Sequence, residues 1–287
     1  MRTFTIWSDV DGFALAGFRW LTSEEPRAVV AISHGTAEHS LRYARFAEAL
    51  NAANIEVWSI DQRGHGQSPG PEGLGDFGDA GWDGLVADIG LLISTTREAR
   101  PEVPVGLFAH SMGSFAAQQY ILDGSANVDF LVLSGSAACE PLPEGTPPPA
   151  FAPNAGFEPA RTPYDWLSRD EAEVDLYIAD PLCGFETRTA TQTSTFDPKR
   201  LTEPAALKEI RSELPILLVA GDQDPINRGM QGLVLLERLY ADSGIARLDT
   251  QYYIDGRHEM LNETNRDEVT TNIVGWIDTI LGVTAND

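Results

Sequence analysis

The stretch VPVGLFAHSMGSFAAQQYIL, residues 103–122, predicts a buried strand that turns into a helix at a serine. Its first part, Val103–Ala109, is an apolar run of strand length, and the residues after Ser111 have the length and composition of a helix. A nucleophile at such a sharp turn needs small residues two positions before and after it, where the chain passes close to itself. Ala109 and Gly113 stand there. A serine at this junction is also typical of a helix N-cap, so the assignment depends on partners elsewhere in the chain.

The chain on either side of this stretch alternates short apolar runs with longer segments of helical period. The first 20 residues are an exception and predict two antiparallel strands joined by Asp11 and Gly12. The alternation predicts a mostly parallel sheet with helices on both faces, an α/β fold. The further predicted strands are Ala28–Ser33, Ile55–Ile60, Phe130–Leu133, Ile216–Ala220 and Leu248–Ile254, and the further predicted helices are Ser40–Ala53, Trp82–Arg97, Gly229–Tyr240 and Asn265–Leu281.

The alternation stops between about Ala137 and Leu201, where the chain is rich in proline and aromatic residues. A segment this long without an alternating pattern is usually functional when it lies inside a compact domain. We therefore predict a core formed by residues 1–136 and 202–287, with residues 137–201 inserted as a cap or lid.

A literal match to the nucleophile pattern G-x-S-x-G occurs at Gly66–Gly70, with Ser68 at its centre. The residue after the nucleophile must donate its backbone N–H to the developing oxyanion, and Pro69 has no N–H. The following Gly70–Gly73 also continues as a loop rather than a helix. We therefore predict a structural role for Ser68 and keep Ser111 as the nucleophile.

The partners of Ser111 follow it in the order acid, then base, that this kind of serine enzyme uses. Asp222 and Asp224 both follow the predicted strand Ile216–Ala220; Asp224 is preferred because it lies further into the loop, and Asp222 stays open as the alternative. Of five histidines only His258 comes after both serine and acid, just past the last predicted strand. His258 is predicted to take the serine proton, with the acid orienting its ring.

The oxyanion hole needs a second backbone N–H from the loop after the strand Ala28–Ser33. That loop begins His34-Gly35-Thr36, and we assign the N–H groups of Thr36 and Met112 as the donors. The glycine at position 35 is also what a tight turn alone would require.

The composition excludes several other classes of protein. The 287 residues hold 20 basic and 43 acidic side chains, a formal net charge of −23, which disfavours binding to nucleic acids and anionic membranes. Two cysteines, Cys139 and Cys183, are too few for a disulfide framework and fit no metal-binding spacing. The N-terminus lacks the apolar core of a signal peptide, and no run is long enough to span a bilayer. A cytoplasmic protein without metal or cofactor is expected, and its oligomeric state is left open.

Several motifs occur in order over nearly the whole chain: His34–Ser40 with Arg42-Tyr43, Asp61–Ser68, His110–Gly113, Asp180–Gly184, Gly221–Pro225 and Arg257–Glu259 with Leu261–Glu263. Together they resemble the monoacylglycerol lipase and bacterial lysophospholipase group of α/β-hydrolases, the serine aminopeptidase S33 type. The sequence departs from this group at Ala109, where these enzymes usually carry glycine, and in the predicted cap, whose similarity is only patchy.

The resemblance implies the α/β-hydrolase fold and the same roles for Ser111, Asp224, His258, Thr36 and Met112. It implies a serine esterase that forms an acyl-enzyme from a mono-acyl ester, a small-molecule substrate with an apolar acyl chain. A lactonase, an amide or peptide hydrolase and a perhydrolase would use the same residues and stay open as alternatives. A binding protein without catalysis is the remaining reading, although such proteins usually lose a member of the triad.

Overall fold

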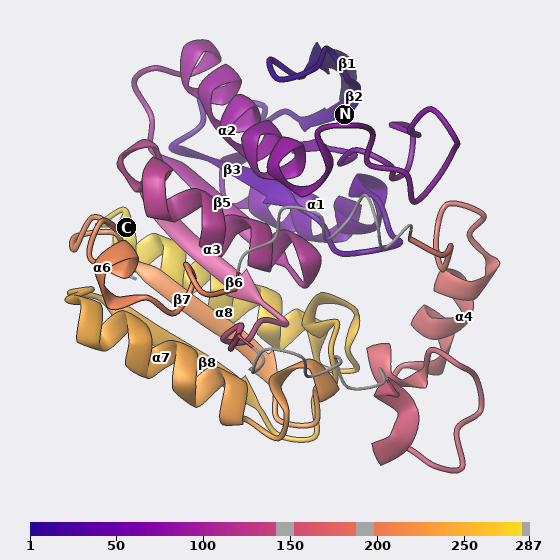
Figure 1. Ribbon diagram of the computed structural model, residues 1–287. Helices are drawn as coiled ribbons and strands as arrows, with labels where there is room; N and C mark the ends of the chain where they lie inside the picture. Colours follow the sequence, from indigo (N-terminus) through magenta and orange to yellow (C-terminus); the bar gives the residue numbers. More distant parts are fainter. Residues whose placement is uncertain (142–151, 188–197, 283–287) are drawn as a thin grey trace.

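The computed structural model describes residues 1–141, 152–187 and 198–282 (Figure 1). Its centre is an eight-stranded sheet with the strand order β1-β2-β4-β3-β5-β6-β7-β8. The first two strands pair antiparallel to their neighbours, and every other pair is parallel. The strands are β1 (Arg2–Trp7), β2 (Ala14–Trp20), β3 (Ala28–Ser33), β4 (Ile55–Ile60), β5 (Val105–His110), β6 (Phe130–Ser134), β7 (Ile216–Gly221) and β8 (Leu248–Tyr253).

Helices cover both faces of this sheet, as Figure 1 shows. Successive side chains of a strand point to opposite faces, so strands β3 to β7, which are buried along their whole length, supply two separate cores. Helices α2, α3 and α7 pack on one face, and α1 and α8 pack on the other. The helices are α1 (Ala44–Ala52), α2 (Gly81–Ala99), α3 (Met112–Gly124), α4 (Glu171–Ala179), α6 (Pro204–Leu207), α7 (Gln231–Ser243) and α8 (Arg266–Ile280).

The predicted mostly parallel sheet with two covered faces is confirmed. One difference lies at the predicted helix Ser40–Ala53, which begins as a 3-10 helix over Ser40–Tyr43 and becomes α-helical only at Ala44. The buried Ser40 N–H donates to Asp61 Oδ1 at 2.8 Å, so a side chain of the neighbouring loop caps this start.

Residues 152–187, the longest described stretch of the predicted cap, contain no strand. This stretch holds two short 3-10 helices, Pro153–Gly156 and Asp165–Leu167, and helix α4. Figure 1 shows α4 to one side of the body that the sheet and its covering helices form. Residues 142–151 and 188–197 of the predicted insertion lie outside the described residues, and the division into core and cap stays a prediction.

No helix in the described ranges combines the length and the apolar character that crossing a bilayer requires.

Candidate active site

Ser111 lies between the last residue of β5 and the first residue of α3, in a backbone conformation that L-residues rarely adopt. Its φ is 50° and its ψ is −120°. Its N–H donates to the Ser134 carbonyl of the neighbouring strand at 3.0 Å, and its carbonyl accepts from Ser114 and Phe115 at the start of α3. Bonds on both sides thus hold the strained turn, a pattern that occurs mainly at functional sites.

Two glycines allow the chain to pass close to this turn. A Cβ atom on Gly113 would lie 2.4 Å from the Ser33 carbonyl oxygen, so α3 can approach β3 only with glycine there. A Cβ atom on Gly35 would lie 3.1 Å from Ser111 Cβ and 2.8 Å from Glu38 Oε1. The loop after β3 therefore runs directly against the serine turn.

His258 follows β8 and contacts Asp224, which follows β7. His258 Nδ1 lies 2.9 Å from Asp224 Oδ2, and both residues are almost completely buried. The other carboxylate oxygen of Asp224 accepts the Ile226 N–H at 2.9 Å, which fixes the orientation of the carboxylate. Asp222 accepts instead from the N–H of Asp255 at 2.8 Å. Of the two aspartates left open by the sequence, the structure thus brings Asp224 to the histidine.

Both residues predicted to supply the oxyanion donors, Thr36 and Met112, line one cavity together with Ser111 and His258. Within the described ranges, the backbone N–H groups of Thr36 and Met112 have no protein acceptor, and no hydrogen bond joins the Ser111 hydroxyl to the His258 ring.

A buried carboxylate holds the loop that carries Thr36. Glu38 Oε1 accepts the N–H of Gly35 at 2.5 Å and the Tyr43 hydroxyl at 2.7 Å, and its other oxygen pairs with Arg42 at 2.7 Å. Burial opposes the charged form of Glu38, but Arg42, the nearby histidines and the Tyr43 hydroxyl together outweigh burial, and the pKa of this carboxyl falls to about 2. Arg42 also binds Glu259, the residue after the histidine, through two hydrogen bonds of 2.6 and 2.7 Å. Arg42 therefore connects the loop after β3, which carries Thr36, to the loop that carries His258.

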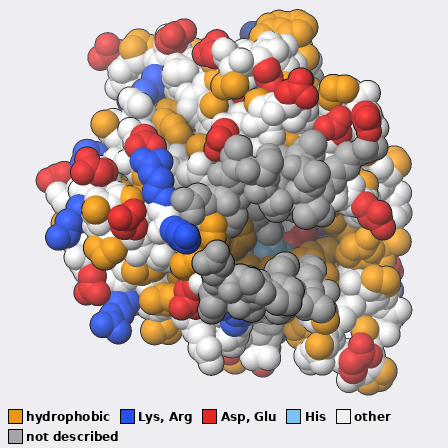
Figure 2. Space-filling view, viewed as in Figure 1, with side chains coloured by type: hydrophobic (Ala, Val, Ile, Leu, Met, Phe, Trp, Pro, Cys, Tyr) orange, Lys and Arg blue, Asp and Glu red, His pale blue; other side chains and the backbone are white. Residues whose placement is uncertain are grey.

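The cavity beside Ser111 has a volume of about 540 Å³. Most of its wall is apolar, and Figure 2 shows a histidine side chain at the bottom of a hollow with hydrophobic side chains around it. The wall comes both from the core and from the described cap residues. Its large apolar side chains are Trp82, Phe115, Trp166, Leu167, Phe185 and Ile226.

The segment of the predicted cap that contains Trp166 is bound closely to the histidine loop. The Trp166 ring lies 4.8 Å from the His258 ring, and the His258 and Glu259 N–H groups donate to the carbonyls of Trp166 and Leu167 at 3.4 and 2.8 Å. The His258 ring also lies 4.7 Å from that of His110, whose pKa burial lowers to about 4. The histidine ring therefore contacts two other rings.

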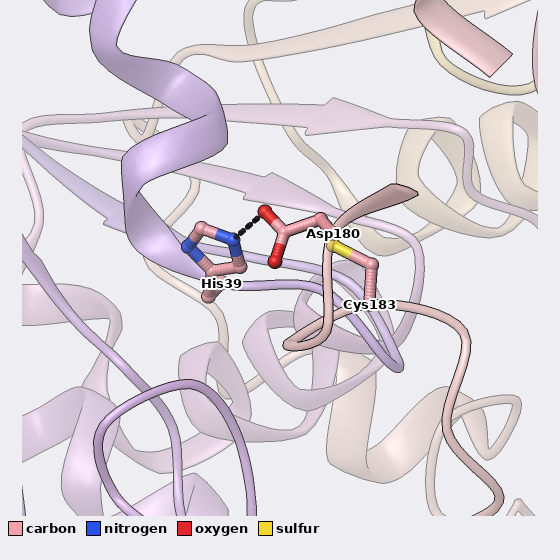
Figure 3. A group of neighbouring side chains, drawn as sticks. All are labelled: His39, Asp180 and Cys183. Atoms are coloured by element: carbon pink, nitrogen blue, oxygen red, sulfur yellow. Dashed lines mark hydrogen bonds and ion pairs between the residues drawn. The ribbon is translucent and has the colours of Figure 1, made fainter. Parts of the chain in front are cut away.

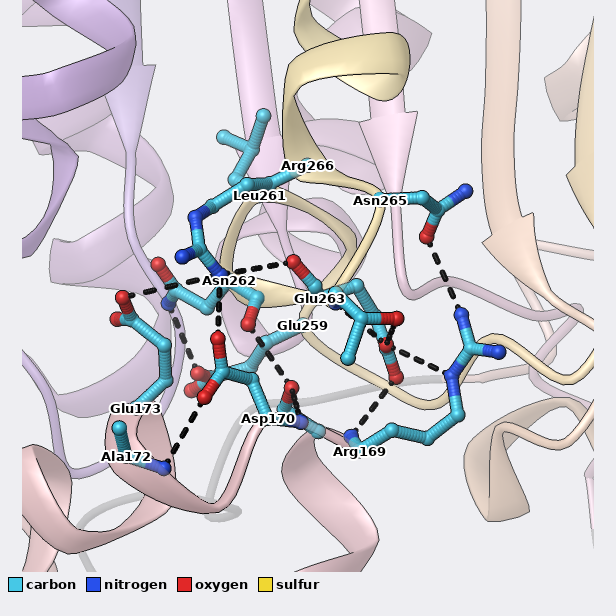
Figure 4. A network of polar contacts seen from close by, with 12 residues as sticks. Arg169, Asp170, Ala172, Glu173, Glu259, Leu261, Asn262, Glu263, Asn265 and Arg266 are labelled. Carbon is cyan, nitrogen blue, oxygen red and sulfur yellow. Dashed lines mark hydrogen bonds and ion pairs between the residues drawn. The ribbon is translucent and has the colours of Figure 1, made fainter.

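Ion pairs also join the residues just after this segment to the end of the histidine loop and the start of α8 (Figure 4). Arg169 Nε binds Glu263 at 2.8 Å, and Arg266 binds Asp170 at 2.7 Å. Glu263 is fully buried and also accepts the backbone N–H groups of Arg169, Arg257 and Thr264 at 2.9–3.0 Å. The Glu263 carboxylate thus binds both the segment of the predicted cap that contains Arg169 and the loop that contains His258.

Replacing Glu263 by alanine is expected to lower the free energy of unfolding by about 3 kcal/mol, because the change leaves an arginine and several N–H groups without their acceptor. The Tm should fall by roughly 6–10 °C in a thermal melt. Glu268 is a matched control, since it is exposed on α8 and binds only the side chain of Asn265. Glu268→Ala should stay within about 0.5 kcal/mol of the parent protein. Equal melting of both variants would contradict the role given to Glu263.

Sequence reasoning did not find Glu38, Arg42, Glu259 or Trp166 as parts of this site. Glu38, Arg42 and Glu259 occur in motifs quoted above, but nothing in their spacing shows that two distant chain segments meet where Arg42 pairs with both carboxylates. Trp166 lies in a segment without periodicity, so only the fold shows that its ring covers the histidine.

Fold and site together define an α/β-hydrolase: a serine at a strained strand-to-helix turn, and a histidine–aspartate pair on loops at the carboxyl ends of neighbouring strands. The chain belongs to the serine aminopeptidase S33 family, whose model matches residues 24–265. The predicted fold and family are both confirmed.

Relatives within this group cover nearly the whole chain. Monoacylglycerol lipase from Mycolicibacterium smegmatis is 26% identical over 94% of this chain and 95% of its own length. Monoglyceride lipase from Rattus norvegicus is 29% identical over 94% and 88%. The structure of a thermostable carboxyl esterase from Bacillus coagulans in complex with glycerol is 25% identical, with a TM-score of 0.84 over 98% of both chains. These relatives confirm the predicted class of activity, carboxylic ester hydrolysis.

Proposed function

We propose that Ser111, His258 and Asp224 act as nucleophile, general base and orienting acid in the hydrolysis of mono-acyl esters such as monoacylglycerols. The observation that carries the proposal is the arrangement at one cavity: a strained serine turn and a buried histidine–aspartate pair beside an apolar wall. Such a cavity suits a substrate with one acyl chain and one ester group.

In the first step the Ser111 hydroxyl oxygen attacks the ester carbonyl while its proton passes to His258 Nε2. That nitrogen is available because Asp224 binds Nδ1. The tetrahedral intermediate collapses, the alcohol leaves with the proton from Nε2, and an acyl-serine ester stays on the enzyme. In the second step His258 takes a proton from water while the water oxygen adds to the acyl carbon; the bond to Ser111 Oγ then breaks, His258 returns the proton to that oxygen, and the free acid is released.

The negative charge of each tetrahedral intermediate is stabilised by the N–H groups of Thr36 and Met112. Removing one such donor typically costs on the order of 3 kcal/mol of transition-state stabilisation. Glu38 supports this arrangement indirectly, because it holds the Gly35 N–H and thereby the loop before Thr36.

The pH dependence of the rate should report the state of His258. Burial lowers the pKa of this ring, but the carboxylates of Asp224, Glu259 and Glu38 together outweigh burial and hold the pKa above its ordinary value of 6.5. Since only the neutral ring accepts a proton, kcat/KM should fall as the pH drops through a value above 6.5, with a slope of about one log unit per pH unit. Steady-state rates from about pH 5 to about pH 8 test this, and a flat profile would contradict the general-base role.

The apolar wall should make the rate depend on acyl length. We propose that residues 137–201 form a cap whose Trp166, Leu167 and Phe185 cover the chain of the substrate. Each buried methylene contributes about 0.8 kcal/mol, so kcat/KM should rise up to about fourfold per methylene until the cavity is full. A small neutral head group suits the site, because anionic substrates are disfavoured by the charge of −23.

A series of monoacylglycerols of increasing acyl length, with release of glycerol as the readout, tests the substrate class directly. Amides and lactones with the same acyl chains serve as controls for the chemistry. We expect glycerol esters to be hydrolysed, with a maximum at intermediate or long chains. Faster cleavage of the matched amide or lactone, or rates independent of acyl length, would overturn the proposed substrate. We also propose that the substrate is the main partner, that no nucleic acid binds, and that the protein is cytoplasmic.

A further inference from the structure

A histidine of the core and two side chains of the predicted cap meet next to the candidate active site (Figure 3). His39 follows the loop that carries Thr36, and Asp180 and Cys183 stand just after α4. One nitrogen of the histidine ring, one carboxylate oxygen and the sulfur all lie within 4.8 Å of one another. None of the three side chains lines the cavity beside Ser111, so the mechanism above does not use them.

We propose that His39, Asp180 and Cys183 bind a divalent cation of the Zn²⁺ type, which joins the cap to the loop of the oxyanion hole. A thiolate, an imidazole and a carboxylate are a ligand set that suits zinc, and water would complete a tetrahedral site. Ligand atoms bound to tetrahedral zinc at roughly 2.0–2.3 Å lie roughly 3.3–3.7 Å apart, so shifts of about 1 Å suffice to close the site.

The hydrogen bond between His39 and Asp180 lies where such an ion would bind. His39 Nε2 lies 2.9 Å from Asp180 Oδ2, and a cation would take the place of the proton between them. His39 would bind as the neutral ring with its proton on Nδ1, while Cys183 would bind as the thiolate and release its proton to solvent. The Asp180 side chain is 31% exposed, which gives an ion access from outside.

The charges around the three ligands also favour a cation. The nearby positive group is Arg42, which is paired with both Glu38 and Glu259 at 2.6–2.7 Å. Together with Asp180 these carboxylates exceed the single positive charge of the arginine. The Cys183 thiol lies within the electrostatic reach of all four of these charged groups, Arg42, Glu38, Asp180 and Glu259.

The backbone between the ligands is already held in place. The Ala37 carbonyl, two residues before His39, accepts the N–H of Gly184 and the hydroxyl of Tyr177, both at 2.9 Å. Gly184 directly follows Cys183, so these two bonds fix the core and cap segments against each other. A site whose ligands are fixed in this way loses little conformational entropy when the ion binds.

A titration of the full chain with Co²⁺ tests the proposal, because a cobalt ion bound by a thiolate has a charge-transfer absorption band in the near ultraviolet. We expect the band to saturate at one equivalent of Co²⁺ per chain and to disappear when Zn²⁺ is added. Cys183→Ala should abolish the band, and His39→Gln should weaken binding by at least about tenfold. Cys139→Ala is the matched control and should keep the band, since Cys139 lines the active-site cavity and is not one of the three proposed ligands.

The variants also separate this site from adventitious binding at the catalytic histidine. Zn²⁺ should raise the Tm of the parent protein and of Cys139→Ala but not that of Cys183→Ala, and Cys183→Ser controls for loss of packing. Cobalt bound without the charge-transfer band, or a band that survives in Cys183→Ala, would overturn the proposal. Hydrolysis of esters by the metal-free protein bears only on the proposed function, so the two can fail separately.

Discussion

Ser111→Ala should lower kcat for ester hydrolysis on the order of 10⁶-fold, the size of effect seen when a serine nucleophile is removed from a triad. The variant loses the oxygen atom of the proposed nucleophile, whereas the cavity and the proposed oxyanion donors stay in place. The Ser111 side chain makes no hydrogen bond within the described residues, so the fold should persist, and circular dichroism and the Tm check this.

Ser68→Ala is the matched control, because Ser68 occupies the literal G-x-S-x-G pattern. Its hydroxyl accepts the Ala16 N–H at 2.8 Å and it is buried, which gives it a structural role between the loop and β2. The control should lower the Tm while kcat stays near that of the parent protein. Loss of activity in Ser68→Ala with a normal melt, together with activity in Ser111→Ala, would contradict the choice of nucleophile.

Asp224→Asn should lower kcat by about 10⁴-fold while the geometry of the site is kept. The Asp224 carboxylate accepts a hydrogen bond from Nδ1–H of His258, which leaves Nε2 as the ring nitrogen that can accept the Ser111 proton in the proposed mechanism. The amide of asparagine can donate to Nδ1 instead, and this favours the tautomer with the proton on the wrong nitrogen.

Asp222→Asn provides a control two positions away on the same loop. Asp222 binds the Asp255 N–H rather than the histidine, so this variant should keep most of the activity. Steady-state rates with one p-nitrophenyl ester compare both variants. A larger loss in Asp222→Asn than in Asp224→Asn would reverse the assignment of the acid.

Much of this molecule can be predicted from sequence because the signals are local. The runs Ala28–Ser33 and Ile216–Ala220 are buried strands of the parallel sheet, and their apolar composition is enough to show it. The serine turn can also be recognised locally, since the missing N–H of Pro69 excludes its competitor. Chain order then selects His258, but two aspartates so close together could be separated only by their contacts.

The contacts of the cap could not be predicted in the same way. Trp166 is 92 positions before His258, and Asp180 is 141 positions after His39, as the residue numbers show. Neither pair is linked by any periodic pattern, because the alternation of apolar runs in the sequence stops between about Ala137 and Leu201. Only the folded chain shows that one part of the cap packs on the histidine loop and another on the loop of Thr36.

This double attachment would give the predicted cap an influence on both halves of the proposed catalytic site. Trp166 and Glu263 tie it to the loop of the proposed base, while Tyr177 and Gly184 bind the Ala37 carbonyl beside the proposed oxyanion donor. Changes in the cap are therefore expected to alter kcat as well as substrate preference, since small displacements of catalytic groups are costly.

The most direct test of the central claim is to locate the covalent adduct that a fluorophosphonate probe forms with the protein. After labelling and proteolysis, mass spectrometry should find one adduct per chain, on Ser111 in the peptide that joins β5 to α3. An adduct on Ser68, or an active enzyme that carries no adduct on Ser111, would contradict the account.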